Sequence, residues 1–129
     1  MPVELQVLAW AVVLAAVQLA SFAIPANLEL GAAYTLGPRD EPRTLSRIPA
    51  RLQRAFGNHL EGLVLYAAAA SAVAAGDASS PFTGACAVVY LLARIAYVPA
   101  YASGVLVLRS AIWSVGFLAT LAMALAALI

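Results

Sequence analysis

Long apolar stretches separated by short polar ones set the pattern of this chain. The first apolar stretch runs from Val3 to Ile24 and is followed by Pro25, and a polar segment, GPRDEPRTLSRIP, covers residues 37–49. Because a bilayer core takes about 20 apolar residues per helix, the pattern predicts four membrane-spanning helices, at residues 3–24, 49–76, 82–101 and 105–128. The expected fold is an all-α integral membrane protein in which residues 1–129 form a single four-helix transmembrane bundle.

Proline, glycine and serine mark the ends of these predicted helices. Pro49 suits a first helical turn, and the segment GDASSP (76–81) predicts a tight turn with Ser80 as the N-cap of the third helix. Gly104 is expected to end that helix. No arginine or lysine precedes the first apolar stretch, which is longer than the roughly 7–15 residues of a signal-peptide core. We therefore expect it to be retained as the first helix.

Composition supports the membrane class and limits the partners. Hydrophobic residues make up 64% of the chain and charged residues 10%, too few charges to cover a soluble domain of this size. The net charge of +1 indicates no nucleic-acid partner. The single cysteine, Cys86, allows no intrachain disulfide and is expected to be a packing residue. His59 has no cysteine or second histidine near it, so we expect a contact between helices, or a position at the interface, and no metal site.

The arginines predict the orientation in the membrane. With four spans, the first and third connections lie on one side and both termini on the other. All seven arginines fall toward the side of these two connections, and the positive-inside rule makes that side cytoplasmic. Abundant alanine and the use of arginine as the only basic residue type are typical of a GC-rich bacterial genome. The predicted location is a bacterial inner membrane with both termini on the non-cytoplasmic side. The arginines are Arg39, Arg43, Arg47, Arg51, Arg54, Arg94 and Arg109.

A polar stripe follows one face of the second predicted helix. At 100° per residue, Arg51, Arg54, Asn58 and Glu61 fall within an arc of about 80°. His59 points away from this arc. A charged side chain within a membrane is costly unless it is paired or faces a wet cavity. The stripe is therefore expected to face protein and not lipid.

Two further polar groups lie on the other helices. Arg94, Tyr97 and Tyr101 form a second stripe on the third predicted helix. Near the start of the fourth, Arg109, Ser110 and Trp113 lie within about a turn of each other. Taken alone, Ser110 is best interpreted as a helix cap.

Glu61 and Arg94 fall at similar predicted depths, about 15–18 Å from the cytoplasmic ends of their helices. This match predicts an ion pair between them, either within one subunit or between subunits. Two interpretations of the stripes stay open at this point. In one, Arg51 and Arg54 extend to the interface and the pair of Glu61 with Arg94 sets the helix register. In the other, the stripes line a polar cleft that opens to the cytosol and binds an anionic polar ligand.

Two segments resemble the MAPEG superfamily, the membrane-associated proteins in eicosanoid and glutathione metabolism. RAFGNHLEGLVLY (54–66) resembles the second-helix signature R-A-x-x-N-x-x-E, and RIAYVPAYASGVLVLRSAIWSVG (94–116) resembles the third and fourth helices with the glycine turn between them. The resemblance implies a homotrimer with glutathione bound between neighbouring subunits near the cytoplasmic side. It implies Arg109 and Ser110 as catalytic residues beside the thiol. The implied glutathione-binding residues are Arg51, Arg54, Asn58, Glu61, Arg94, Tyr97 and Tyr101.

The implied function is a glutathione-dependent transferase or peroxidase acting on lipophilic electrophiles, with glutathione as co-substrate and membrane lipids around the trimer. The alternative is a non-catalytic membrane subunit, or a lipid-binding assembly protein, that keeps the MAPEG fold. Three departures from the family pattern bear on this choice. Gly57 stands where eicosanoid-type members carry a second arginine, Tyr97 stands where several carry a histidine, and the segment 25–34 has no arginine.

Overall fold

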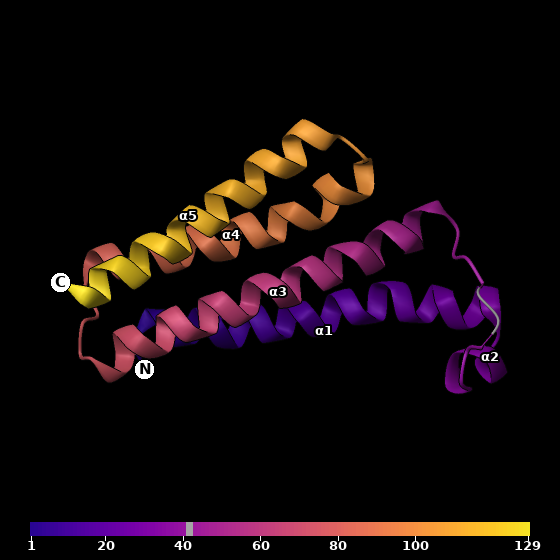
Figure 1. Cartoon of the computed structure of the whole chain (residues 1–129), viewed down its shortest axis with the longest axis horizontal. Helices are drawn as coiled ribbons and strands as arrows, with labels where there is room; N and C mark the ends of the chain where they lie inside the picture. Colours follow the sequence, from indigo (N-terminus) through magenta and orange to yellow (C-terminus); the bar gives the residue numbers. More distant parts are fainter. Residues whose placement is uncertain (41–42) are drawn as a thin grey trace.

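The computed structural model describes residues 1–40 and 43–129, and within these ranges every regular element is a helix. The all-α expectation is therefore confirmed. The four long helices run antiparallel in two pairs, α1 with α3 and α4 with α5 (Figure 1). Residues 41 and 42 of the predicted loop at 37–49 lie outside the described ranges. The helices are α1 (Val3–Leu30), α2 (Ala32–Leu36), α3 (Arg47–Ala75), α4 (Pro81–Ser103) and α5 (Leu106–Leu128).

Three of these helices, α1, α4 and α5, are long and apolar enough to cross a membrane. Helix α3 has 29 residues, but the polar stripe falls in its first half and lowers its mean hydropathy. It lies alongside α1 over most of its length (Figure 1). That α3 crosses the membrane with the other three stays a prediction.

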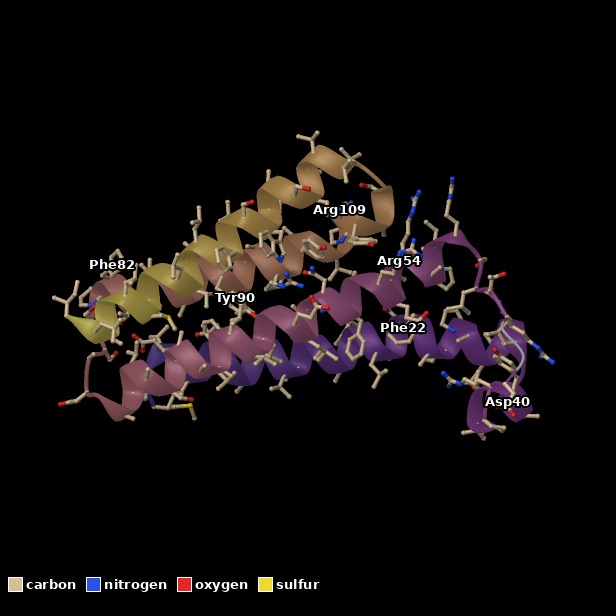
Figure 2. All side chains as sticks on the ribbon, viewed as in Figure 1. Phe22, Asp40, Arg54, Phe82, Tyr90 and Arg109 are labelled. Atoms are coloured by element: carbon tan, nitrogen blue, oxygen red, sulfur yellow. The ribbon has the colours of Figure 1, made fainter. Side chains whose placement is uncertain are left out.

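The connections are arranged as the sequence predicts. The α1–α3 and α4–α5 connections lie at one end of the bundle, and both termini lie at the other (Figure 1). Arg54 and Arg109 both lie toward the end with the connections (Figure 2). We refer to this end as the arginine end.

Pro25 does not end the first helix, contrary to the predicted boundary at residue 24. Helix α1 continues to Leu30 and stops at Gly31, whose φ is +87°. The fixed φ of proline is compatible with a helix, and its cost is one lost hydrogen bond and a clash with the preceding turn. Such prolines are tolerated in membrane helices.

The last turn of α1 is tied to the start of α3. The backbone N and Oγ of Ser46 each donate to the Glu29 carboxylate at 2.8 Å. A carboxylate in this place satisfies a free N–H at the first turn of α3 and interacts favourably with the positive end of its dipole.

The boundaries around α4 follow the prediction more closely. Ser80 caps α4 in a reciprocal capping box with Thr83, as its position predicts. Gly104 ends the helix in the left-handed region, with φ of +79°. The prediction of Ser110 as a helix cap is wrong, because α5 begins one turn earlier, with Val105 as its N-cap. The tight turn between the two helices allows α5 to start directly after Gly104.

Two stacked tyrosines form the centre of the core. The rings of Tyr66 in α3 and Tyr90 in α4 lie 4.2 Å apart at an angle of 10°, and both side chains are buried. The hydroxyl of Tyr66 donates to the backbone carbonyl of Glu4 at 2.7 Å. This contact joins α3 to the first turn of α1.

Glu4 is fully buried at the end of the bundle that holds the termini. Ser79 Oγ lies 3.0 Å from both carboxylate oxygens, and the hydroxyl of Thr83 also donates to the carboxylate. The negative charge therefore sits at the N-terminus of α4, where the helix dipole stabilises an anion.

Candidate functional site

Most of the predicted site residues meet in a hollow at the arginine end. The hollow has a volume of about 510 Å³ and lies between α3, α4 and α5. Arg54 on α3 and Arg109 on α5 both contact Tyr101, which lines it. We call it the outer hollow. Its lining residues are Asn58, Tyr97, Tyr101, Arg109, Ser110, Trp113 and Ser114.

Tyr101 lies between two guanidinium groups at the rim of the outer hollow. The guanidinium of Arg109 lies over its ring at 4.6 Å from the centroid, and Arg54 Nε donates to its hydroxyl at 3.2 Å. A cation over a tyrosine face is attracted by the ring quadrupole. The aromatic contacts therefore hold two positive charges close to one opening.

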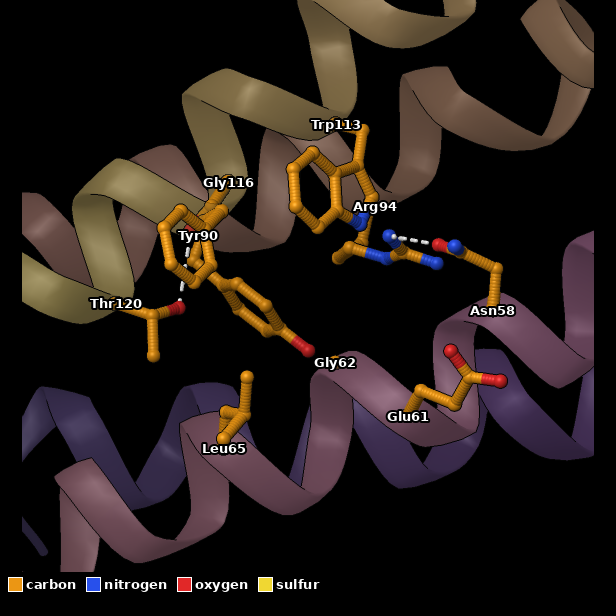
Figure 3. Close-up of a pocket in the computed structure, with 10 residues that line it drawn as sticks. Asn58, Glu61, Gly62, Leu65, Tyr90, Arg94, Trp113, Gly116 and Thr120 are labelled. Atoms are coloured by element: carbon orange, nitrogen blue, oxygen red, sulfur yellow. Dashed lines mark hydrogen bonds between the residues drawn. The ribbon is translucent and has the colours of Figure 1, made fainter.

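A smaller cavity lies deeper in the bundle and adjoins the outer hollow. It has a volume of about 130 Å³ and shares Asn58 and Trp113 with the outer hollow. Figure 3 shows Glu61, Tyr90 and Arg94 around it. We call it the inner cavity. Its remaining lining residues are Gly62, Leu65, Gly116, Phe117 and Thr120.

Arg94 is the buried charged residue at the inner cavity, and it is only 3% exposed. Its Nη1 donates to Asn58 Oδ1 at 3.0 Å, its Nε lies 3.3 Å from His59 Nδ1, and its guanidinium stacks on Tyr97 at 4.5 Å. Arg94 Nη2 and the Tyr90 hydroxyl are buried and have no hydrogen-bond partner. Two donors at the inner cavity are therefore available to water or a ligand.

The predicted ion pair between Glu61 and Arg94 is wrong for the single chain. Both residues line the inner cavity, but Glu61 is exposed and the structure gives no ion pair between them (Figure 3). The depths match as predicted, whereas the rotation of α3 turns Asn58 and His59 toward Arg94. Neutral acceptors hold this cation in place of a carboxylate.

His59 makes the helix contact that the sequence predicts, and it reaches a second helix as well. Its Nε2 lies 2.9 Å from the backbone carbonyl of Ala11 in α1, and its Nδ1 faces Arg94 Nε in α4. Because guanidinium nitrogens only donate, Nδ1 must accept and Nε2 carries the proton. One neutral imidazole therefore bridges α1 and α4.

Arg51 does not line the outer hollow, although it belongs to the same polar stripe of α3 as Arg54 and Asn58. Its Nη1 donates to the backbone carbonyl of Ala102 at 2.9 Å, and its guanidinium lies against Gly104. The last carbonyls of a helix lack intrahelical partners. Arg51 satisfies one of them at the end of α4, so its position supports a structural role.

Tyr90 is the member of the site that the sequence interpretation missed. It stands one helical turn before Arg94, so it lies on the same face of α4, and this spacing is the signal that could have identified it. Gly116 and Thr120 of α5 carry no comparable signal. Trp113 was identified with Arg109 and Ser110 as one local group, and all three line the outer hollow.

Comparison with known proteins gives one result for this chain. The family model described as the MAPEG family matches residues 7–129, which is nearly the whole chain. No curated protein and no solved structure matches it significantly.

Proposed function

This chain belongs to the MAPEG family, and from that membership we propose that it is a glutathione-dependent transferase or peroxidase acting on lipophilic electrophiles. It is an integral membrane protein, because the family is one of membrane proteins and three of its helices are long and apolar enough to cross a membrane. The proposed thiol site is the outer hollow with the adjoining inner cavity. We further propose that α3 also crosses the membrane, that the membrane is a bacterial inner membrane, and that the arginine end is cytoplasmic.

The observation that carries the proposal is the set of charges around the outer hollow. Arg54 and Arg109 bring two cations to its rim through their contacts with Tyr101, and Glu61 brings a carboxylate to the adjoining inner cavity. Glutathione carries two carboxylates and one ammonium group, which is the complementary set. Asn58 offers an amide for the peptide groups between them. The volume of about 510 Å³ lies within the range of small-molecule sites.

Glutathione would supply a thiol, with a pKa of about 8.5 when free, that reacts as the thiolate. The contribution of this chain is to favour that ionised form. Arg109 lies in the first turns of α5, so the positive end of the helix dipole adds to its own charge. The Ser110 hydroxyl is a second donor at the same wall. Both would act in a site partly shielded from water, where a cation stabilises an anion more strongly than at a surface.

A trimer is part of the proposal. Glu61 and Arg54 are exposed in the single chain, and a charged side chain that faces lipid is costly. A neighbouring subunit packed on this face of α3 would cover both residues and close the outer hollow. Mass measurement of the assembly in mild detergent tests this part, and a monomer or dimer would contradict it.

One observation favours the alternative of a non-catalytic membrane subunit. Arg51, Arg54 and Arg94 all make hydrogen bonds within the chain, as structural arginines do. In this alternative the polar stripes hold the bundle together and bind no thiol.

Binding of glutathione by the purified protein distinguishes the two functions. Titration calorimetry in detergent is expected to give millimolar or tighter binding, and the bound thiol should show thiolate absorption at a lower pH than free glutathione. S-methylglutathione is the control, because it has the same charges and no ionisable thiol. Absence of both binding and thiolate signal would leave the non-catalytic subunit as the better account.

A further inference from the structure

A second polar pocket lies at the arginine end, on the α1 side of the bundle. It has a volume of about 370 Å³ and is formed by the last turns of α1, by α2, by Arg39, Arg43 and Leu45, and by Gln53 of α3. None of the residues proposed to bind the thiol lines it. We call it the basic pocket, because Arg39 and Arg43 are on its wall.

Both arginines of the basic pocket are held in place by backbone carbonyls. Arg39 Nε and Nη2 donate to the carbonyl of Thr35 at 2.9 and 2.6 Å. Arg43 Nη1 donates to the carbonyl of Leu30 at 3.1 Å, and its guanidinium lies over the ring of Tyr34 at 4.4 Å. Two long side chains are thus ordered before any ligand arrives, which lowers the entropy cost of binding.

Arg39 also has an unusual backbone. Its φ is +57°, a conformation that costs a residue with a Cβ about 1–2 kcal/mol. This conformation turns the chain back so that the guanidinium meets the carbonyl of Thr35. The backbone at Arg39 therefore keeps its charge against the wall of the pocket.

The guanidinium groups retain donors for a ligand. Within the described part of the chain, Arg39 Nη1 and Arg43 Nε and Nη2 have no hydrogen-bond partner. The carboxylate of Glu29 is bound by Ser46 and does not pair with either arginine. A guanidinium fork with free donors matches the oxygens of a phosphate group.

One wall of the basic pocket is apolar and belongs to the membrane helix α1. Leu19, Phe22 and Ala26 of α1 line it beneath the polar groups. Phe22 is fixed there by its contact with the ring of Phe56 in α3, 5.4 Å away. The pocket thus joins a cationic rim to an apolar wall at the end of a helix that is long and apolar enough to cross a membrane.

We propose that the basic pocket binds an anionic phospholipid, with the phosphate at Arg39 and Arg43 and the first part of an acyl chain against Leu19 and Phe22. Basic pockets at the ends of membrane helices bind such headgroups. A free phosphate would use the two arginines but not the apolar wall. The proposal concerns a lipid site and is independent of the thiol chemistry proposed above.

The test measures lipid binding by the full-length protein in detergent, with native mass spectrometry as the readout. The probes are short-chain phosphatidylglycerol, short-chain phosphatidylcholine, glycerol phosphate and inorganic phosphate, in about 0.3 M salt to screen charges outside the pocket. Phosphatidylglycerol is expected to bind at least tenfold more tightly than the other three. The Arg39→Gln/Arg43→Gln variant should weaken it about 25-fold, since an arginine near an anionic headgroup contributes about fivefold.

The matched control is Arg47→Gln, because Arg47 is exposed at the same end and does not line the basic pocket. It should change phosphatidylglycerol binding less than about twofold in this salt. If Arg47→Gln weakens phosphatidylglycerol binding as much per removed charge as Arg39→Gln/Arg43→Gln does, the proposal is overturned. The lipid would then bind to a diffuse positive surface and not to the basic pocket. Equal binding of inorganic phosphate would overturn the assignment to a lipid. Circular dichroism of each variant verifies that the helices are intact.

Discussion

His59 Nδ1 lies 3.3 Å from Arg94 Nε, and this contact ties the most buried cation of the chain to a neutral imidazole. The other ring nitrogen of His59 binds the carbonyl of Ala11. The arrangement predicts that His59→Leu leaves one buried guanidinium N–H without its partner, which should cost about 1–3 kcal/mol of stability, whereas the Ala11 carbonyl keeps its bond within α1. Thermal unfolding in mild detergent measures the loss.

His59→Asn is the informative companion to that variant. Its amide oxygen can still accept from Arg94, although the side chain is too short to reach Ala11 as well. The unfolding temperature of His59→Asn should lie between those of the parent protein and His59→Leu. If all three proteins unfold at the same temperature, the bridge does not contribute to stability.

Glu4→Ala is predicted to destabilise the opposite end of the bundle. Ser79 and Thr83 both donate to this buried carboxylate, and hydrogen bonds to a charged group are worth about 1.5–3 kcal/mol each. Glu4→Gln retains an acceptor oxygen and should lose less. Asp77→Asn is the control, because Asp77 is exposed at the same end and asparagine tolerates its positive φ. The free energy of unfolding in a denaturant titration is the measurement, and a neutral Glu4→Ala would contradict the prediction.

Arg109→Ala and Arg54→Ala should differ in which kinetic constant they change. Removal of Arg109 takes away the proposed thiolate stabiliser, so kcat should fall about 100-fold and the bound thiol should ionise at higher pH. Removal of Arg54 should mainly raise the KM for glutathione, because its proposed partner is a carboxylate away from the sulfur. Arg47→Gln controls for the loss of one positive charge. The assay uses glutathione and a generic lipophilic electrophile, and identical effects of Arg54→Ala and Arg109→Ala would contradict the assigned roles.

Gly104→Ala and Gly57→Ala should have opposite effects on stability. At Gly104 the positive φ is strained for alanine by about 1–2 kcal/mol, and an added Cβ would lie 2.8–2.9 Å from atoms of the Arg51 guanidinium. At Gly57, inside α3, a Cβ meets nothing within 4 Å, so alanine should stabilise the helix by up to about 1 kcal/mol. Paired thermal unfolding curves test the difference. A destabilising Gly57→Ala in the assembled protein would indicate that a neighbouring subunit approaches closely there.

The elements of the fold were largely predictable because their signals are local. Apolar length, the serine before Pro81 and the glycine at 104 each act within a few residues of their position in the chain. The end of the first helix was wrongly predicted at Pro25 because the last turn of α1 is bound by a partner outside its own sequence. Ser46, which donates to Glu29, lies 17 residues further along the chain. Buried Glu4 was beyond prediction for the same reason, since its partners lie more than 70 residues away.

The sequence predicted which residues lie at the site, but it did not predict which of them contact each other. Helical spacing placed Asn58, Tyr97 and Arg109 on faces that do meet at the outer hollow. It also matched Glu61 with Arg94 in depth, and depth leaves the rotation of each helix about its axis undetermined. A rotation of α3 by a fraction of a turn decides between a carboxylate and the pair of Asn58 and His59 as the partner of Arg94. Packing against α1 sets that rotation, through the bond from His59 to Ala11.

The bonds of Arg94 have a consequence for how the chain is made. Ribosomes synthesise a protein from its N-terminus, so α1 and α3 are made before α4 is complete. The acceptors on Asn58 and His59, and the carbonyl of Ala11 that orients the imidazole, are therefore present when Arg94 arrives. Helix α5 follows after Gly104 and Val105 alone, so it enters as the second arm of a hairpin. The order of synthesis lets a helix with a charge at its middle insert against partners that are already in place.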